Sequence, residues 1–152
     1  MPEGIVIADA SPLIALVDIG ELNLLHQLYE RVFITDIVKN ELHAELPIWI
    51  EVSTNYNQSQ FKILQLELDP GEASAIALAL KNPDSRIIID ENKGRSVAKR
   101  LGLKVTGTLG IIVKAKEQGF IQSGKEILYK LETHGFWLSE RLKSHILSRL
   151  GE

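Results

Sequence analysis

The chain alternates short runs of β-branched and apolar residues with longer segments that repeat apolar residues at helical spacing. The runs GIVIA (Gly4–Ala8) and RIII (Arg86–Ile89) are typical of buried strands, whereas residues 73–80 carry apolar side chains at the i, i+3, i+4, i+7 positions of a helix. Further strands are expected at 31–34 and 103–106, with a strand or turn at 47–52. This alternation predicts an α/β fold of three layers, α/β/α, around a central, mostly parallel sheet.

The length of 152 residues fits one domain. We therefore expect residues 1–152 to form a single domain, in which residues of about 123–150 form two closing helices. Their apolar stripe either packs on the rest of the domain or stays exposed for a second copy or a partner protein.

Cysteine is absent, which excludes a disulfide framework, thiol catalysis and cysteine-type zinc or iron–sulfur sites. The first residues lack the basic start of a signal peptide, and Glu3, Asp9 and Asp18 interrupt the apolar stretch. No run approaches the length of a membrane span. We expect a protein with no membrane partner that is located in the cytoplasm.

The net charge of −3 hides an uneven distribution. Residues 1–72 hold 3 basic and 12 acidic side chains, whereas residues 73–152 hold 14 basic and 8 acidic ones. Such a division fits an acidic site beside a cationic surface, and it equally fits ordinary solvated helix faces.

Four acids occupy unusual places in this pattern. Asp9 and Asp90 each follow an expected strand directly, and the carboxyl ends of parallel strands meet at the sheet edge where ligands bind. Glu41 and Glu72 lie within otherwise apolar helical patterns. Each acid alone has a simpler explanation, as a helix cap, a favourable charge at a helix N-terminus or a solvated residue. Together, oxygen ligands without histidine or cysteine suit Mg²⁺ or Mn²⁺.

Other common sites lack their motifs. The phosphate-binding loop GxxxxGK[ST], a GxGxxG after the first strand and the nucleophile elbow GxSxG are all missing, and the four histidines have no metal-ligand spacing.

The order of the motifs resembles the PIN-domain superfamily, and in particular short prokaryotic PIN-like proteins related to VapC-type toxin ribonucleases. The motifs that carry the resemblance are IVIADASPLIAL (Ile5–Leu16), VKNEL (Val38–Leu42), LDPGEASAIALAL (Leu68–Leu80), RIIIDENKGRSVAKRLGL (Arg86–Leu103) and VTGTLGIIVKAKEQGFI (Val105–Ile121).

This resemblance implies a metal-dependent endoribonuclease, the toxin of a toxin–antitoxin pair, with RNA as substrate, a cognate antitoxin and a homodimeric assembly. It also implies that Mg²⁺ or Mn²⁺ is bound by the catalytic acids Asp9, Glu41, Glu72 and Asp90. Ser11, Glu91 and Thr108 would support these ligands. Many PIN nucleases carry a further acid after the last strand, and the stretch Thr106–Gly110 has none.

A cationic segment follows Asp90 and could hold RNA phosphates. Its candidate residues are Lys93, Arg95, Lys99 and Arg100, which flank the buried stripe of the expected helix. The simpler interpretation is a solvated helix face. No aromatic cluster indicates base stacking.

Two other functions stay open at this point. The first is a non-catalytic PIN-like module that binds RNA or protein. The second is a metal-dependent phosphatase or receiver-like protein, although paired acids after the first strand and a lysine after a late strand are not evident.

Overall fold

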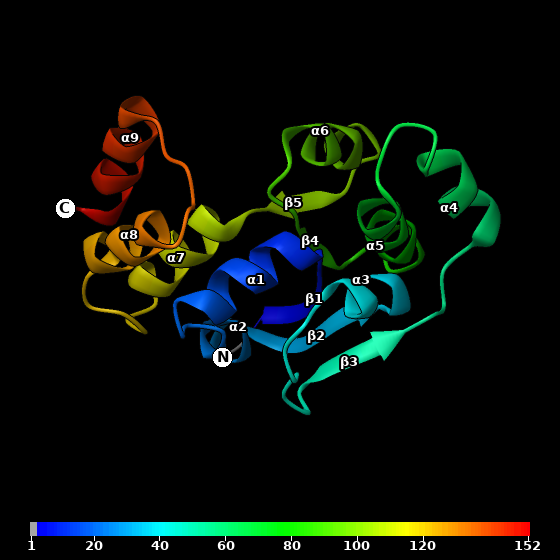
Figure 1. The fold of residues 1–152 in the computed structure, drawn as a ribbon, viewed down its shortest axis with the longest axis horizontal. Helices are drawn as coiled ribbons and strands as arrows, with labels where there is room; N and C mark the ends of the chain where they lie inside the picture. The colour runs from blue at the N-terminus through cyan, green and yellow to red at the C-terminus, as the bar shows by residue number, and fades with distance from the viewer. Residues whose placement is uncertain (1–2) are drawn as a thin grey trace.

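The computed structural model describes residues 3–152, and its core is a sheet of five parallel strands (Figure 1). The strands lie in the order β3-β2-β1-β4-β5. They comprise β1 (Glu3–Ala8), β2 (Tyr29–Thr35), β3 (Ile50–Ser53), β4 (Arg86–Ile88) and β5 (Lys104–Thr106). Every neighbouring pair is parallel, with Val6 opposite both Val32 and Arg86. Among the described residues, the sheet is therefore wholly parallel.

Helices cover both faces of this sheet. One face packs against α1 (Ala10–Asp18), α2 (Asn23–Leu28) and α7 (Thr108–Glu117). The other packs against α4 (Gln58–Leu64), α5 (Pro70–Lys81) and α6 (Asn92–Arg100). The short helix α3 (Asp36–Glu41) contributes Val38 to the hydrophobic cluster on the first face and Ile37 to the cluster on the second face. The predicted three-layer α/β/α fold is confirmed.

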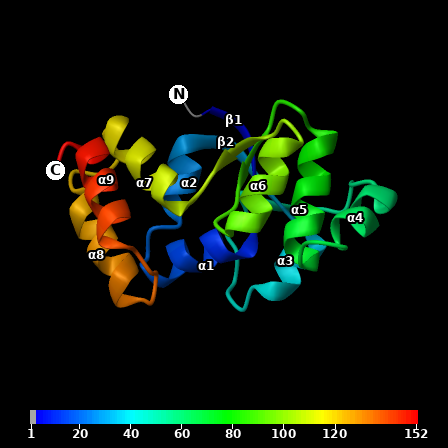
Figure 2. The same ribbon diagram turned by 90° about the horizontal axis from the view of Figure 1, so that it is seen from above.

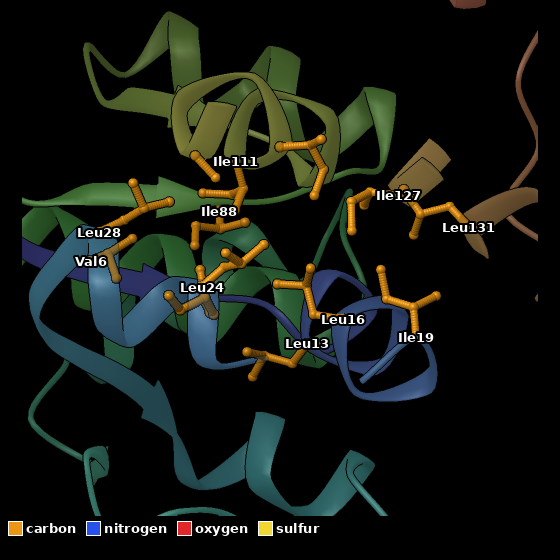
Figure 3. Close-up of a cluster of buried hydrophobic side chains, with 14 of the residues drawn as sticks. Val6, Leu13, Leu16, Ile19, Leu24, Leu28, Ile88, Ile111, Ile127 and Leu131 are labelled. Atoms are coloured by element: carbon orange, nitrogen blue, oxygen red, sulfur yellow. The ribbon is translucent and has the colours of Figure 1, made fainter. Parts of the chain in front are cut away.

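The pleat of β1 divides its side chains between two hydrophobic clusters. Val6 and Ala8 join the cluster under α1, α2 and α7, whereas Ile7 joins the cluster under α5 and α6. Figure 3 shows the first cluster, which includes Leu13 and Leu16 of α1, Ile88 of β4 and Ile111 of α7. A strand that is apolar on both faces is what a parallel sheet requires, because helices bury both sides.

Two further helices, α8 (Gly124–Thr133) and α9 (Glu140–Leu150), extend the first cluster at one end of the molecule. Figures 1 and 2 show them packed together beyond α7, at the opposite end from α4. Their apolar stripe packs on the domain, because Leu128, Leu131, Ile146 and Leu150 are all buried. Leu142 is the partly exposed member of the stripe.

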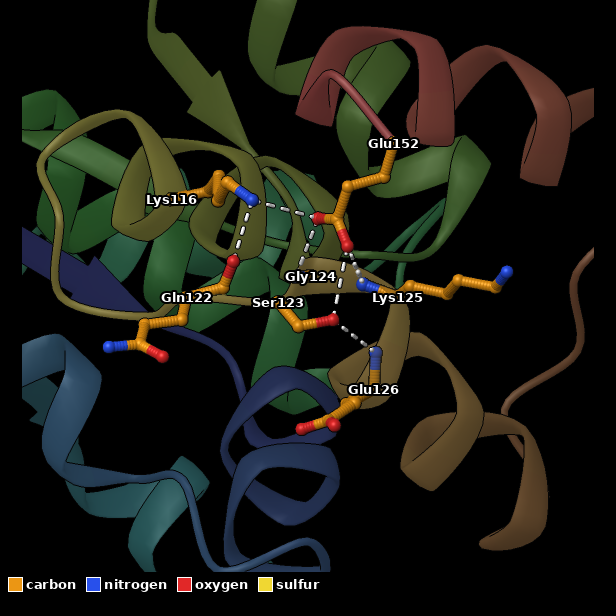
Figure 4. A network of polar contacts seen from close by, with 7 residues as sticks. All are labelled: Lys116, Gln122, Ser123, Gly124, Lys125, Glu126 and Glu152. Atoms are coloured by element: carbon orange, nitrogen blue, oxygen red, sulfur yellow. Dashed lines mark hydrogen bonds and ion pairs between the residues drawn. The ribbon is translucent and has the colours of Figure 1, made fainter.

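The end of the chain is tied to the start of α8 (Figure 4). Glu152 accepts hydrogen bonds from the Gly124 N–H at 2.8 Å, the Lys125 N–H at 3.3 Å and Ser123 Oγ at 3.0 Å, and it lies 3.2 Å from Lys116 Nζ. Desolvation opposes the charge of this carboxylate, but the Gly124 hydrogen bond and Lys116 outweigh it and lower the pKa of Glu152 to about 2.

The segment 47–52, expected to be a strand or a turn, holds a turn at 48–49 and then the edge strand β3. The polar stretch 53–60 leads from β3 into α4, where Asn57 caps the helix by accepting from the Gln60 N–H at 2.9 Å. Within residues 3–152, no helix combines the length and apolar character needed to cross a membrane.

Candidate functional site

The site lies where the order of the strands reverses, between β1 and β4. The chain continues from β1 to β2 on one side, while β4 and β5 extend the sheet on the other side. In open parallel sheets this reversal leaves a crevice at the carboxyl ends of the strands. Asp9 follows β1 and Asp90 follows β4, and the Asp9 N–H donates to the Ile88 carbonyl at 2.9 Å. The two strand-end acids therefore flank this crevice.

Asp9 is buried at the start of α1. Only 4% of its surface is exposed, and it occupies the N-cap position without a side-chain capping bond. The capping explanation for this acid therefore lacks its hydrogen bond. Burial, together with the charges of Asp69, Glu41 and Asp90, raises the pKa of Asp9 to about 7, against a hydrogen bond from the Ala10 N–H that lowers it. This carboxylate is held close to other acids in an apolar surrounding.

Asp90 is fixed by the start of α7, and its neighbour Glu91 occupies the N-cap position of α6. Its Oδ1 accepts from the Thr108 N–H at 2.7 Å, and its Oδ2 accepts from Thr108 Oγ1 at 2.6 Å. Thr108 is fully buried, so its hydroxyl can hold the carboxylate in one orientation. Thr108 was expected to support a metal ligand, and the structure places it directly on Asp90.

Glu72 lies in the first turn of α5, where it is 5% exposed. Burial raises the pKa of Glu72 to about 8, with further contributions from a hydrogen bond to Asp69, from the charge of Asp69 and from Asp9. Glu72 Oε2 is buried and has no hydrogen-bond partner among the residues that the structure describes. A buried carboxylate oxygen without a donor is costly unless a proton or a cation compensates it.

Glu41, the last residue of α3, is the most exposed of the four acids. Partial burial raises its pKa, and the charge of Asp69 adds to that rise. Its carboxylate lies on Gly71, because a methyl group added there would collide with Glu41 Oε1 and would lie 2.9 Å from Oε2. Glu41 therefore packs against the first turn of α5, the turn that also carries Glu72.

Asp69 is a fifth acid of this cluster that sequence reasoning missed. Its Oδ1 accepts from the Glu72 N–H at 2.8 Å, as a helix N-cap does. Its charge also raises the pKa of Asp9, Glu41 and Glu72. The sequence Asp69-Pro70-Gly71-Glu72 is typical of a capped helix start. That pattern explains Asp69 without indicating that its charge also belongs to the acidic cluster.

Three glycines give the carboxylates room. Gly71 accommodates Glu41, as described, and a methyl group on Gly94 would lie 2.7 Å from Glu72 Oε2. One on Gly107 would lie 2.7 Å from both Asp90 Oδ1 and Arg95 Nη1. The backbones of α5, α6 and the N-cap of α7 thus lie close to the acids, because each has a glycine at the point of contact.

The donor set fits a divalent cation in its chemistry. All five groups are carboxylates, the charge of Asp69 raises the pKa of Asp9, Glu41 and Glu72, and one buried oxygen lacks a donor among the described residues. A cation would remove the repulsion and compensate Glu72 Oε2. Across residues 3–152, however, no three of these acids are already in the arrangement of a metal-binding cluster. Binding would therefore require small movements of the side chains, of which the exposed Glu41 is the freest.

The remaining candidate residues lie around this cluster. Ser11 is exposed and lines the groove beside Asp90, and Glu91 is the exposed N-cap residue of α6 without a capping bond. Arg95 Nη1 donates to the Ile89 carbonyl at 2.9 Å, next to Asp90. The other three cations, Lys93, Lys99 and Arg100, are exposed on α6 and do not line this groove.

Comparison with known families identifies the fold. A family model described as DUF3368, a PIN domain, matches residues 5–152. Searches of curated proteins and of solved structures gave no match. The matched range includes every acid of the cluster, both strands that flank the crevice and the C-terminal helices. The chain belongs to the PIN-domain family, whose members are typically metal-dependent nucleases.

Proposed function

We propose that this protein is an endoribonuclease that uses Mg²⁺ or Mn²⁺ to hydrolyse RNA phosphodiester bonds. The observation that carries the proposal is the convergence of five acids at the crevice between β1 and β4, including a buried Glu72 oxygen without a donor. Membership of the PIN-domain family supports the same class of reaction.

Asp9, Glu72 and Asp90 would hold the cation, with Glu41 completing the site. A divalent cation bound there would offset the charge of the phosphodiester and act as a Lewis acid. Thr108 keeps the Asp90 carboxylate oriented, and Gly94 leaves space for Glu72. Asp69 adds negative charge beside Asp9 and Glu72, which strengthens the attraction for a cation. Arg95, next to Asp90, is placed to contact a phosphate of the bound strand.

Cleavage of a labelled RNA with and without Mn²⁺ tests this proposal. The wild type is expected to cleave only with metal, and Asp9→Asn and Asp90→Asn are each expected to lower the rate by at least a hundredfold. Asp84→Asn, at an exposed turn outside the site, serves as the matched control. Equal, metal-independent cleavage by all four proteins would reject the proposal.

A non-catalytic PIN-like module that binds RNA or protein is the alternative. It is favoured by one observation: within residues 3–152 the acids do not already form a tight metal cluster. RNA binding by the wild type, with no turnover in any divalent cation, would establish this alternative.

We further propose that the nuclease is the toxin of a toxin–antitoxin pair and acts as a homodimer with a cognate antitoxin. This part rests on the resemblance of the motifs quoted above. Expression of the wild type is expected to arrest growth, whereas Asp9→Asn is expected to be harmless at the same protein level. Normal growth with the active enzyme would contradict a toxin role.

A further inference from the structure

A groove of about 940 Å³ leads away from the acidic cluster toward the C-terminal helices. Ser11, Asp90 and Arg95 line it near the site, and its other walls come from β5, α7 and α9. Figure 1 shows α6 and α9 on the same side of the molecule, with β5 and the start of α7 between them. Arg86, the first residue of β4, and Asp90, two residues after its end, both line the groove, so the groove reaches both ends of this strand.

The groove carries Arg95, which the sequence predicted, and three cations from outside α6 that it did not predict. These are Arg86, Lys114 and Arg149, and the acids of the groove are Asp90, Glu91 and Glu117. Asp90 belongs to the proposed cation site, so a bound metal would offset its charge. With a metal bound at the acidic cluster, the groove would therefore attract a polyanion.

An aromatic side chain completes the groove. Trp137 lines it and is 81% exposed, which is unusual for so large an aromatic side chain. The other tryptophan, Trp49, stacks on His26 with ring centroids 4.8 Å apart. Phe136 and Leu138 on either side of Trp137 pack into the hydrophobic core. Because both neighbours are anchored, the loop holds the indole at the groove.

Helix α9 presents a polar face next to this indole. His145 and Arg149 lie one turn apart on it, and both line the groove. The turn before them contributes Leu142, which is 37% exposed. A protein segment would be held best by a continuous apolar surface. Cations spaced along a groove with one exposed aromatic ring instead suit phosphates and an unpaired base.

We propose that this groove binds a single-stranded segment of RNA and guides it to the acidic cluster. Trp137 stacks on an unpaired base, while Arg149 and Arg95 contact phosphates on either side of it. This inference rests on the proposed nuclease function, and it names the strand's path and the residues that hold it. A duplex is a poor ligand because its bases are already stacked on one another.

The test measures binding of a fluorescent twelve-nucleotide oligouridine RNA in EDTA, so that no cleavage occurs. Trp137→Ala is expected to weaken binding by roughly 5- to 150-fold, the range for loss of one base–aromatic stack. Tyr129→Ala is the matched control, because Tyr129 is 69% exposed on α8 and does not line the groove. Trp137→Phe is expected to restore most of the affinity.

The cations are tested by salt dependence. Arg149→Ala is expected to reduce the slope of log affinity against log salt by about 0.7, the value for one phosphate contact on a single strand. Arg141→Ala is the control, since Arg141 is exposed on the same helix outside the groove. An unchanged slope in Arg149→Ala would overturn its assignment to a phosphate.

A direct signal comes from the indole itself. In a Trp49→Phe background, oligouridine RNA is expected to quench the fluorescence of Trp137 as binding saturates. Three results would overturn the proposal: saturated RNA binding without quenching, equal affinity of Trp137→Ala and Tyr129→Ala for the RNA, or equal affinity of the wild type for a duplex. A protein segment would then be the better candidate ligand of the groove. If one of these results is found and the wild type still cleaves RNA, the groove proposal is wrong and the proposed nuclease function stands. If Trp137→Ala selectively loses binding but the wild type does not cleave RNA, the groove proposal stands and the proposed nuclease function is wrong.

Discussion

The Glu72 carboxylate rests against the backbone of Gly94, so that a methyl group added to Gly94 would lie 2.7 Å from Glu72 Oε2. Gly94→Ala is therefore expected to displace Glu72 and to press on Ile89, whose Cδ1 would be 2.6 Å away. We expect a loss of about 1–3 kcal/mol in the free energy of unfolding and at least tenfold weaker metal-dependent activity. Urea unfolding and cleavage rates measure the two effects.

The control for this substitution is Gly4→Ala, because nothing lies within 4 Å of a methyl group at Gly4. At Gly94, which lies within α6, alanine favours the helix over glycine by about 1 kcal/mol. If Gly94→Ala stabilised the protein by that amount and retained full activity, the close contact with Glu72 would not be needed for stability or for activity.

The metal-free protein is expected to lose stability as the pH rises from about 4 to about 8. Burial raises the pKa of Asp9 to about 7 and of Glu72 to about 8. Between the ordinary carboxyl pKa and these values, the unfolded chain releases protons that the folded chain retains, so rising pH favours unfolding. Between pH 5 and pH 8 the two shifts together correspond to a loss of roughly 6 kcal/mol, measurable by urea unfolding in EDTA at these two pH values.

Asp9→Asn isolates the contribution of one acid to this pH dependence. The variant is expected to be more stable than the wild type at pH 8 and to show a smaller difference between pH 5 and pH 8. Mn²⁺ is expected to stabilise the wild type more at pH 8 than at pH 5, because protons compete with the cation. Identical pH dependence in the two proteins would show that Asp9 is not buried in the way described.

Thr108→Val removes the hydroxyl that donates to Asp90 Oδ2 at 2.6 Å and keeps the shape of the side chain. The N–H bond of Thr108 to Oδ1 remains, so Asp90 keeps one of its two restraints. We expect a loss of roughly 1.5–3 kcal/mol in stability, as for a hydrogen bond to a charged group, and slower cleavage. Thr108→Ser is expected to restore both, and equal activity of Thr108→Val and wild type would contradict a positioning role.

Glu152→Gln is expected to lower the melting temperature at pH 7, because the carboxylate joins the start of α8 to Lys116. The folded pKa of about 2 lies below the ordinary value of 4.5. This stabilisation is therefore complete above about pH 4.5 and is lost as the pH falls through about 2. The exposed Glu67→Gln provides the control. A melting temperature shift that persists unchanged near pH 2 would contradict the charge-based explanation.

The parts of the fold that follow from local patterns were predictable. The runs at Gly4–Ala8 and Arg86–Ile89 form β1 and β4, and the acids after them, Asp9 and Asp90, flank the same crevice because the strands are parallel neighbours. Glu41 and Glu72 were expected at the site from the resemblance of their motifs. The pKa shifts of these acids record their proximity.

The unpredicted parts depend on packing between distant segments. Asp69 has the sequence context of any helix cap, and only the fold brings it beside Asp9. The groove joins residues from β4 to α9, and Trp137 becomes notable only because Leu138 is buried and Phe136 partly buried while Trp137 is exposed. Periodicity reports which face of one element is buried. It carries no information about which elements meet.

The most direct test of the acidic cluster as a cation site is a calorimetric titration of the metal-free protein with Mn²⁺ at pH 8. The wild type is expected to bind Mn²⁺ with a saturable signal, and Asp9→Asn and Asp90→Asn are each expected to weaken that binding by at least tenfold, while Asp84→Asn binds as the wild type does. Equal binding by all four proteins, or no saturable binding by the wild type, would contradict the account.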